Sequence, residues 1–148
     1  MNIDEILKIE DNNQKIVVLH QFCNQHHKNW TETEKLINAI LDMESEVMNG
    51  GFHQYFLNSA GDQWQDVSIG LDKIGAIRTK ELFKKSLTIF INSQPPIVWE
   101  ERQKIVNNLS QEQIAYLDIL DQDFYKYEDN IQLLTIAYAE KQRNDFGE

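Results

Sequence analysis

Apolar residues recur along this chain mostly at intervals of three and four positions, which is the spacing of an amphipathic α-helix. The clearest case begins at Thr31. Thr31 and Glu34 form the pattern of a capping box, which predicts a helix start, and Asn49-Gly50 predicts the end of this helix. Its apolar stripe comprises Leu36, Ile37, Ile40, Leu41, Val47 and Met48.

The same spacing predicts further helices on both sides of this one. No stretch alternates apolar and polar residues over more than a few positions, so no strand is expected. Pro95-Pro96 is the one hard break, because the residue before a proline avoids helical backbone angles. The expected helices cover residues 14–30, 31–48, 62–75, 82–90, 98–109, 110–127 and 131–138. With no linker, internal repeat or low-complexity tract between them, we predict a single compact all-α domain of about seven helices over residues 1–148.

Composition narrows the classes of function. A formal net charge of −10, from 24 acidic and 14 basic residues, disfavours direct binding to nucleic acid and favours attraction to basic proteins. Cys23 is the single cysteine, which excludes an internal disulfide and fits a reducing compartment. No apolar run is long enough to span a membrane, and the acidic N-terminus lacks the features of a signal peptide. We therefore expect a cytoplasmic protein without membrane contact.

Few residues suggest catalysis or metal binding. His26 and His27 are adjacent and would point about 100° apart on a helix, and no acidic residue completes a ligand set, so we expect no metal and no cofactor. Glu44 falls within the apolar stripe of the 31–48 helix, where a carboxylate must find hydrogen-bond donors or protonate. We expect a buried acid that braces the next segment of chain, with the aromatic residues and backbone N–H groups of that segment as donors. The alternative is an uncharacterised enzyme in which Glu44 is a general base near His53.

The segment from Asn49 to Asp62 is the most distinctive part of the chain. It holds three of the six glycines, and it predicts a shaped junction between two helices. The pattern Asn49-Gly50-Gly51-Phe52-x-Gln54-Tyr55-Phe56-x-Asn58-Ser59-x-Gly61-Asp62 resembles the signature of a bacterial family of unknown-function domains, whose characterised relative is a DNA-mimic protein. Two later landmarks also match, Leu71-x-x-Ile74-Gly75-Ala76 and Leu120-Asp121-x-x-Phe124-Tyr125, so that the resemblance spans about residues 46–130.

The resemblance implies an all-helical homodimer that presents carboxylates to a basic, DNA-binding protein such as a transcriptional repressor, with no enzymatic activity. The signature itself consists mainly of glycines, aromatic residues and amides, with Glu44 beside it, and we interpret it as architecture. The partner-binding surface is therefore expected among acidic side chains elsewhere. Acids three or four positions apart on a helix lie about 5–6 Å apart, near the spacing of phosphates along one DNA strand. The candidates are Asp42, Glu46, Asp118, Asp121, Asp123, Glu128 and Asp129.

A second hypothesis remains open beside mimicry. An acidic inhibitor of the immunity or antitoxin type would recognise one toxin by shape, and its binding would tolerate salt. A DNA mimic depends on charge, so its binding should weaken steeply as salt rises.

Overall fold

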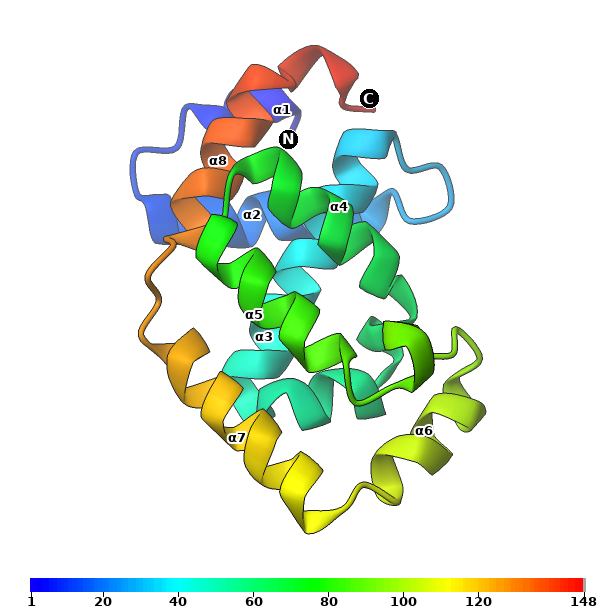
Figure 1. The fold of residues 1–148 in the computed structure, drawn as a ribbon. Coiled ribbons are helices and arrows are strands. Elements are labelled where there is room, and N and C mark those ends of the chain that lie inside the picture. Colours follow the sequence, from blue (N-terminus) through cyan, green and yellow to red (C-terminus); the bar gives the residue numbers. More distant parts are fainter. Residues whose placement is uncertain (148) are drawn as a thin grey trace.

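The computed structural model describes residues 1–147, which form eight α-helices and three short 3₁₀ helices with no strand among them (Figure 1). This confirms the predicted all-α class. The α-helices are α1 (Ile3–Leu7), α2 (Asn12–Gln25), α3 (Glu32–Leu57), α4 (Trp64–Ile74), α5 (Ile77–Leu87), α6 (Trp99–Asn107), α7 (Gln111–Tyr125) and α8 (Ile131–Lys141). The 3₁₀ helices are η1 (Ser59–Gln63), η2 (Ile91–Ser93) and η3 (Arg143–Asp145).

Seven of the α-helices correspond to predicted ones, and α1 is the addition. This helix has only five residues, too few to show an apolar period, but Asn2 and Glu5 form a complete capping box at its start. Ile6 is fully buried against α2, and Asp4 pairs with Arg143 near the other terminus. Packing against the neighbouring α2 and an ion pair with a residue near the C-terminus therefore hold α1 in place.

The long central helix α3 is interrupted where the sequence predicts its end. Gly50 and Gly51 leave the helical region, with Gly51 at φ 78° and ψ −178°, and the chain becomes helical again at Phe52. The predicted stop is therefore correct in position, but the helix restarts at once in a new direction. Gly51 has no substitute here, because its φ is positive and a β-carbon would overlap the carboxylate of Asp121.

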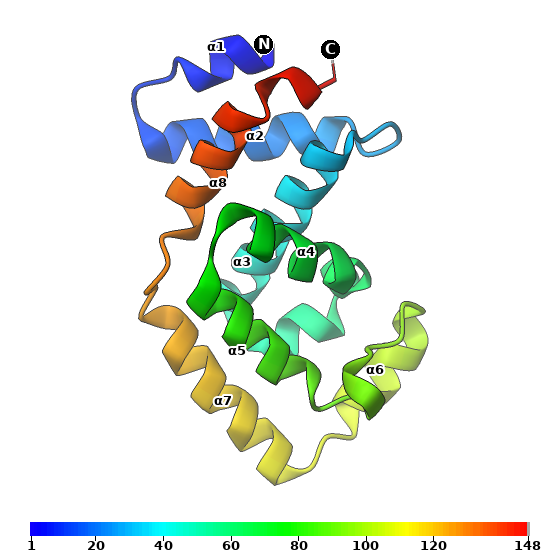
Figure 2. The same cartoon turned by 45° about the horizontal axis from the view of Figure 1, so that its top comes forward.

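Two clusters of buried side chains surround α3. The larger cluster lies around its second half, where Phe52 packs edge-on against Phe124 at a centroid distance of 5.8 Å, with α4, α5 and α7 around it. The smaller cluster fills the space between the first half of α3 and α1, α2 and α8. Figures 1 and 2 show α1, α2 and α8 at the end that carries both termini, and α6 and α7 at the other end.

Across residues 1–147, no helix combines the length and the apolar character that crossing a bilayer requires.

Candidate functional site

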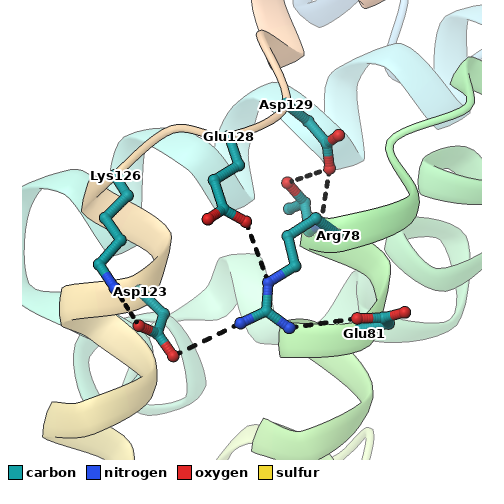
Figure 3. Close-up of polar contacts among 7 residues, drawn as sticks. Arg78, Glu81, Asp123, Lys126, Glu128 and Asp129 are labelled. Carbon is teal, nitrogen blue, oxygen red and sulfur yellow. Dashed lines mark hydrogen bonds and ion pairs between the residues drawn. The ribbon is translucent and has the colours of Figure 1, made fainter.

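The acidic residues that the sequence singles out lie in two separate clusters, one formed by α5, α7 and the connection after α7, the other along α3. In the first cluster a single arginine is surrounded by three carboxylates (Figure 3). Arg78 donates to Glu128 and Glu81, each at 3.1 Å, and lies 3.6 Å from Asp123. Asp123 also pairs with Lys126 at 3.0 Å, and that hydrogen bond lowers the pKa of the Asp123 carboxyl. Much of the negative charge of this cluster is therefore neutralised within the chain.

Two further acids of the predicted surface serve the fold. Asp129 accepts hydrogen bonds from the backbone N–H of Thr79 at 2.7 Å and from its hydroxyl at 3.0 Å. It thereby caps α5, whose own N-cap residue, Ala76, has no side chain able to do so. Asp121 is only 7% exposed and accepts the backbone N–H of Phe52 at 2.8 Å, while its burial raises the pKa of the carboxyl. The expectation that Asp121 belongs to an exposed acidic row is corrected by this inward position.

Asp118 differs from its neighbours on α7. It is exposed, and within residues 1–147 its side chain has no hydrogen bond or ion pair. Of the predicted acids in and after α7, Asp118 is thus the one left free to meet another molecule.

Glu44 is buried as predicted, but its donors are different from those expected. It is 7% exposed, and it accepts the hydroxyl of Tyr127 at 3.0 Å and the side-chain amide of Gln132 at 2.7 Å. Both donors come from the end of α7 and the start of α8, so Glu44 braces that connection and not the glycine junction. Burial is the main reason that the pKa of Tyr127 is raised, and Glu44 adds to it. His53 lies near enough to Asp121 to oppose, electrostatically, the rise in the pKa of that carboxyl.

The second cluster lines a cavity of about 540 Å³ between the end of α2, the first part of α3 and η1. We call this cavity the α3 hollow. Its acidic walls are Asp42 and Glu46 from α3 and Asp62 from η1, and the described residues place no lysine or arginine on its lining. Trp30, Asn38 and Ser45 also line the hollow. Among residues 1–147 no group of three or more histidine, cysteine or acidic side chains is arranged to hold a metal ion.

Amide groups hold Glu46 of the α3 hollow in place, whereas Asp42 and Asp62 each have a basic side chain beside them, His20 and Arg102. Glu46 Oε2 accepts the side-chain amides of Gln54 at 2.8 Å and Asn58 at 2.9 Å. Asp42 accepts the amide of Asn38 at 2.9 Å and is 2.8 Å from His20 Nε2. The sequence interpretation gives Gln54 and Asn58 a purely architectural role, but the structure shows that these signature amides orient one of the candidate partner-binding acids.

A buried arginine lies behind Asp62, and the sequence analysis missed it. Arg102 is fully buried and donates to the backbone oxygens of Phe56 at 2.7 Å, Asn58 at 2.9 Å and Pro96 at 2.9 Å. A fourth bond, 2.7 Å long, reaches Asp62 Oδ1. The end of α3, η1 and the proline loop are thus joined through one guanidinium. The available signal was the position of Arg102 on the apolar face of its helix, four residues before Val106.

The pKa of the buried Tyr55 is affected by charged groups in and behind the α3 hollow. Burial is the main reason that its pKa is raised, and the carboxylates of Asp42 and Asp62 raise it further, against the lowering effect of Arg102. Its hydroxyl has no hydrogen-bond partner among the described residues. Arg102 and the carboxylates of the hollow therefore act on the Tyr55 hydroxyl in opposite directions.

Comparison with known proteins gives one match. The family model described as DMP19-like protein matches residues 28–142, a range that includes the glycine junction and every lining residue of the α3 hollow except Asn24 and His27. A search of curated proteins and a search of solved structures each returned no match.

Proposed function

Because the chain belongs to the DMP19-like protein family, whose type is a DNA mimic, we propose that it binds the nucleic-acid-binding face of a basic partner, such as a transcriptional repressor. In this role it is a binding protein and not an enzyme, and it works in the cytoplasm as a homodimer. The partner is held through carboxylates that take the place of DNA phosphates.

The observation that carries the proposal is the way in which the acids of the α3 hollow are held. Asp42 and Glu46 lie one helical turn apart on α3, about 6 Å along the axis. Amide groups fix Glu46 without neutralising it, so it keeps its full charge, as a phosphate does. Asp62 is paired with Arg102 and Asp42 lies 2.8 Å from His20, so Glu46 is the acid of the hollow that contacts no basic side chain among the described residues. The carboxylates of the Arg78 cluster, in contrast, all contact Arg78. The α3 hollow, with Asp118 as a separate exposed acid, is therefore the better candidate for contact with a basic partner.

Competition with DNA tests the proposal directly. Each DNA-binding regulator encoded in the source genome is purified and loaded with its own fluorescent operator, and this protein is then added while anisotropy is followed. We expect at least one regulator to release its operator in proportion to the amount of protein added. We also expect the release to weaken strongly as NaCl rises from about 50 to about 200 mM, because charge drives the association.

Two results contradict mimicry. One is that every regulator keeps its operator at saturating protein. The other is tight, salt-tolerant binding to a toxin, which selects the immunity-type alternative.

A further inference from the structure

The α3 hollow contains hydrogen-bond acceptors for which the chain supplies no donors. Asn38 is 2% exposed and lines the hollow, where its amide nitrogen donates to Asp42, but its Oδ1 has no partner within residues 1–147. Glu46 Oε1 and Asp62 Oδ2 also accept no hydrogen bond from the described residues. Asn38 Oδ1 is a buried polar atom without a partner, which is costly, whereas Glu46 is half-buried and Asp62 is exposed, so that their free oxygens face solvent. All three are acceptors, so the site favours a ligand that brings donors only.

The walls also fit a flat cation. Trp30 lines the hollow, and its indole N–H is committed to the backbone oxygen of Cys23, which fixes the ring as an aromatic wall. Guanidinium groups stack on such faces and are attracted to them by cation–π interaction. A volume of about 540 Å³ has room for the planar group together with its methylene chain.

From these features we propose that the α3 hollow is a guanidinium pocket, which takes an arginine side chain presented by the partner protein. A guanidinium carries five N–H donors in one plane and accepts none, so its chemistry complements the free oxygens of Glu46 and Asp62 and the unpartnered Oδ1 of Asn38. An ammonium group concentrates its donors on one atom, and a metal ion would need a ligand set that the described residues do not form.

This inference rests on the proposed function, because arginine is the residue that DNA-binding faces use for bidentate contact with phosphate. It adds to that function a specific pocket, the α3 hollow, into which one arginine side chain of the partner fits. It also explains why the signature amides Gln54 and Asn58 hold Glu46 so firmly.

The pocket can be tested without the partner. The probe is N-acetyl-arginine N-methylamide, titrated into ¹⁵N-labelled protein, and the matched control is the citrulline analogue, which has the same shape but no charge. We expect the arginine probe to shift the indole N–H of Trp30 and the side-chain amide of Asn38 with saturation, and citrulline to shift neither. Equal shifts with both probes, or no shift with either, overturn the pocket.

Substitutions assign the binding to the hollow. Glu46→Gln keeps an acceptor oxygen for Gln54 and Asn58, so the local structure is retained, and we expect it to weaken the arginine probe about fivefold. The control variant, Glu112→Gln, removes an exposed acid at the start of α7, outside the hollow, and should leave the affinity unchanged. A further variant, Ser45→Arg, fills the hollow with a guanidinium that belongs to the protein itself, so it should abolish the shifts that the arginine probe causes. Equal affinity in all three variants contradicts the assignment.

Failure of the pocket and failure of the proposed function give different results. If a regulator loses its operator to the Glu46→Gln and Ser45→Arg variants as readily as to the parent, the pocket is refuted and mimicry stands. If arginine binds and Glu46→Gln weakens it, but no regulator releases its operator, mimicry is refuted and the pocket stands.

Discussion

Replacement of Arg102 by lysine tests whether one buried side chain holds the chain around Asp62 together. The guanidinium spreads its donors over four acceptors at 2.7–2.9 Å: the backbone oxygens of Phe56, Asn58 and Pro96, and the carboxylate of Asp62. Lysine keeps the charge but offers all its donors from one nitrogen. The Arg102→Lys variant therefore changes the geometry of the donors and leaves the formal charge as it was.

The loss can be estimated from these bonds. A single ammonium can keep about two of the four acceptors, and each hydrogen bond from a charged donor contributes about 1.5–3 kcal/mol. We expect Arg102→Lys to lower the free energy of unfolding by about 3–5 kcal/mol, which is also the cost of breaking a buried ionic contact. For a chain of this size such a change lowers Tm by roughly 10 °C.

Urea denaturation followed by far-UV circular dichroism at pH 7 measures the effect, with an unchanged m-value showing that the two states are comparable. The matched control is Arg78→Lys, because Arg78 also contacts three acids but does so at the surface. We expect its midpoint to stay close to that of the parent. If Arg102→Lys is no less stable than Arg78→Lys, the four-acceptor account of Arg102 is wrong.

Three further substitutions address the junction and the cap. Gly51→Ala should lower stability by about 3 kcal/mol in urea, more than Gly75→Ala, since both have positive φ but only Gly51 has a carboxylate where the methyl group must go. Asp129→Ala should cost about 1 kcal/mol through loss of the α5 cap, and no change in the urea midpoint contradicts that role. The folded-state pKa of Asp121 is raised above 3.8, so its contribution to stability is greatest below that pH and falls as pH rises through the raised value. Asp121→Asn keeps an acceptor for Phe52 and should remove this decline, and identical pH profiles for both proteins would refute the assignment.

Local patterns in the sequence predicted seven of the eight α-helices of residues 1–147, but they did not predict the partners of the polar groups on these helices. The capping box at Thr31 and the left-handed Gly75 both lie where the sequence indicates. The burial of Glu44 was also predicted, because a carboxylate in an apolar stripe must turn inward. Its donors, Tyr127 and Gln132, were not predicted, since they lie more than eighty residues further along the chain and helical periodicity carries no information about that distance.

The acidic residues show more clearly that spacing along the sequence does not predict tertiary partners. Spacing alone treats Asp118, Asp121 and Asp123 as members of one exposed row. The structure gives them three different environments: free, buried against Phe52, and paired with cations. Which acids remain available depends on where α5 presents Arg78 and where the kink at Gly51 presents its N–H group. Both are tertiary features, so they could not be read from the period of α7.

The glycine junction connects the architecture of this chain to its proposed function. The kink lets Gln54 lie beside Glu46 from the preceding turns of α3, and Asn58, at the end of the same helix, adds the second amide. The next residue begins η1, whose Asp62 forms another wall of the α3 hollow. The signature segment, which the sequence analysis interprets as architecture, therefore also positions two of the hollow's three carboxylates, Glu46 and Asp62. In this geometry, a change that straightens the kink should weaken partner binding even when every acid of the hollow is kept, because the amides would no longer reach Glu46.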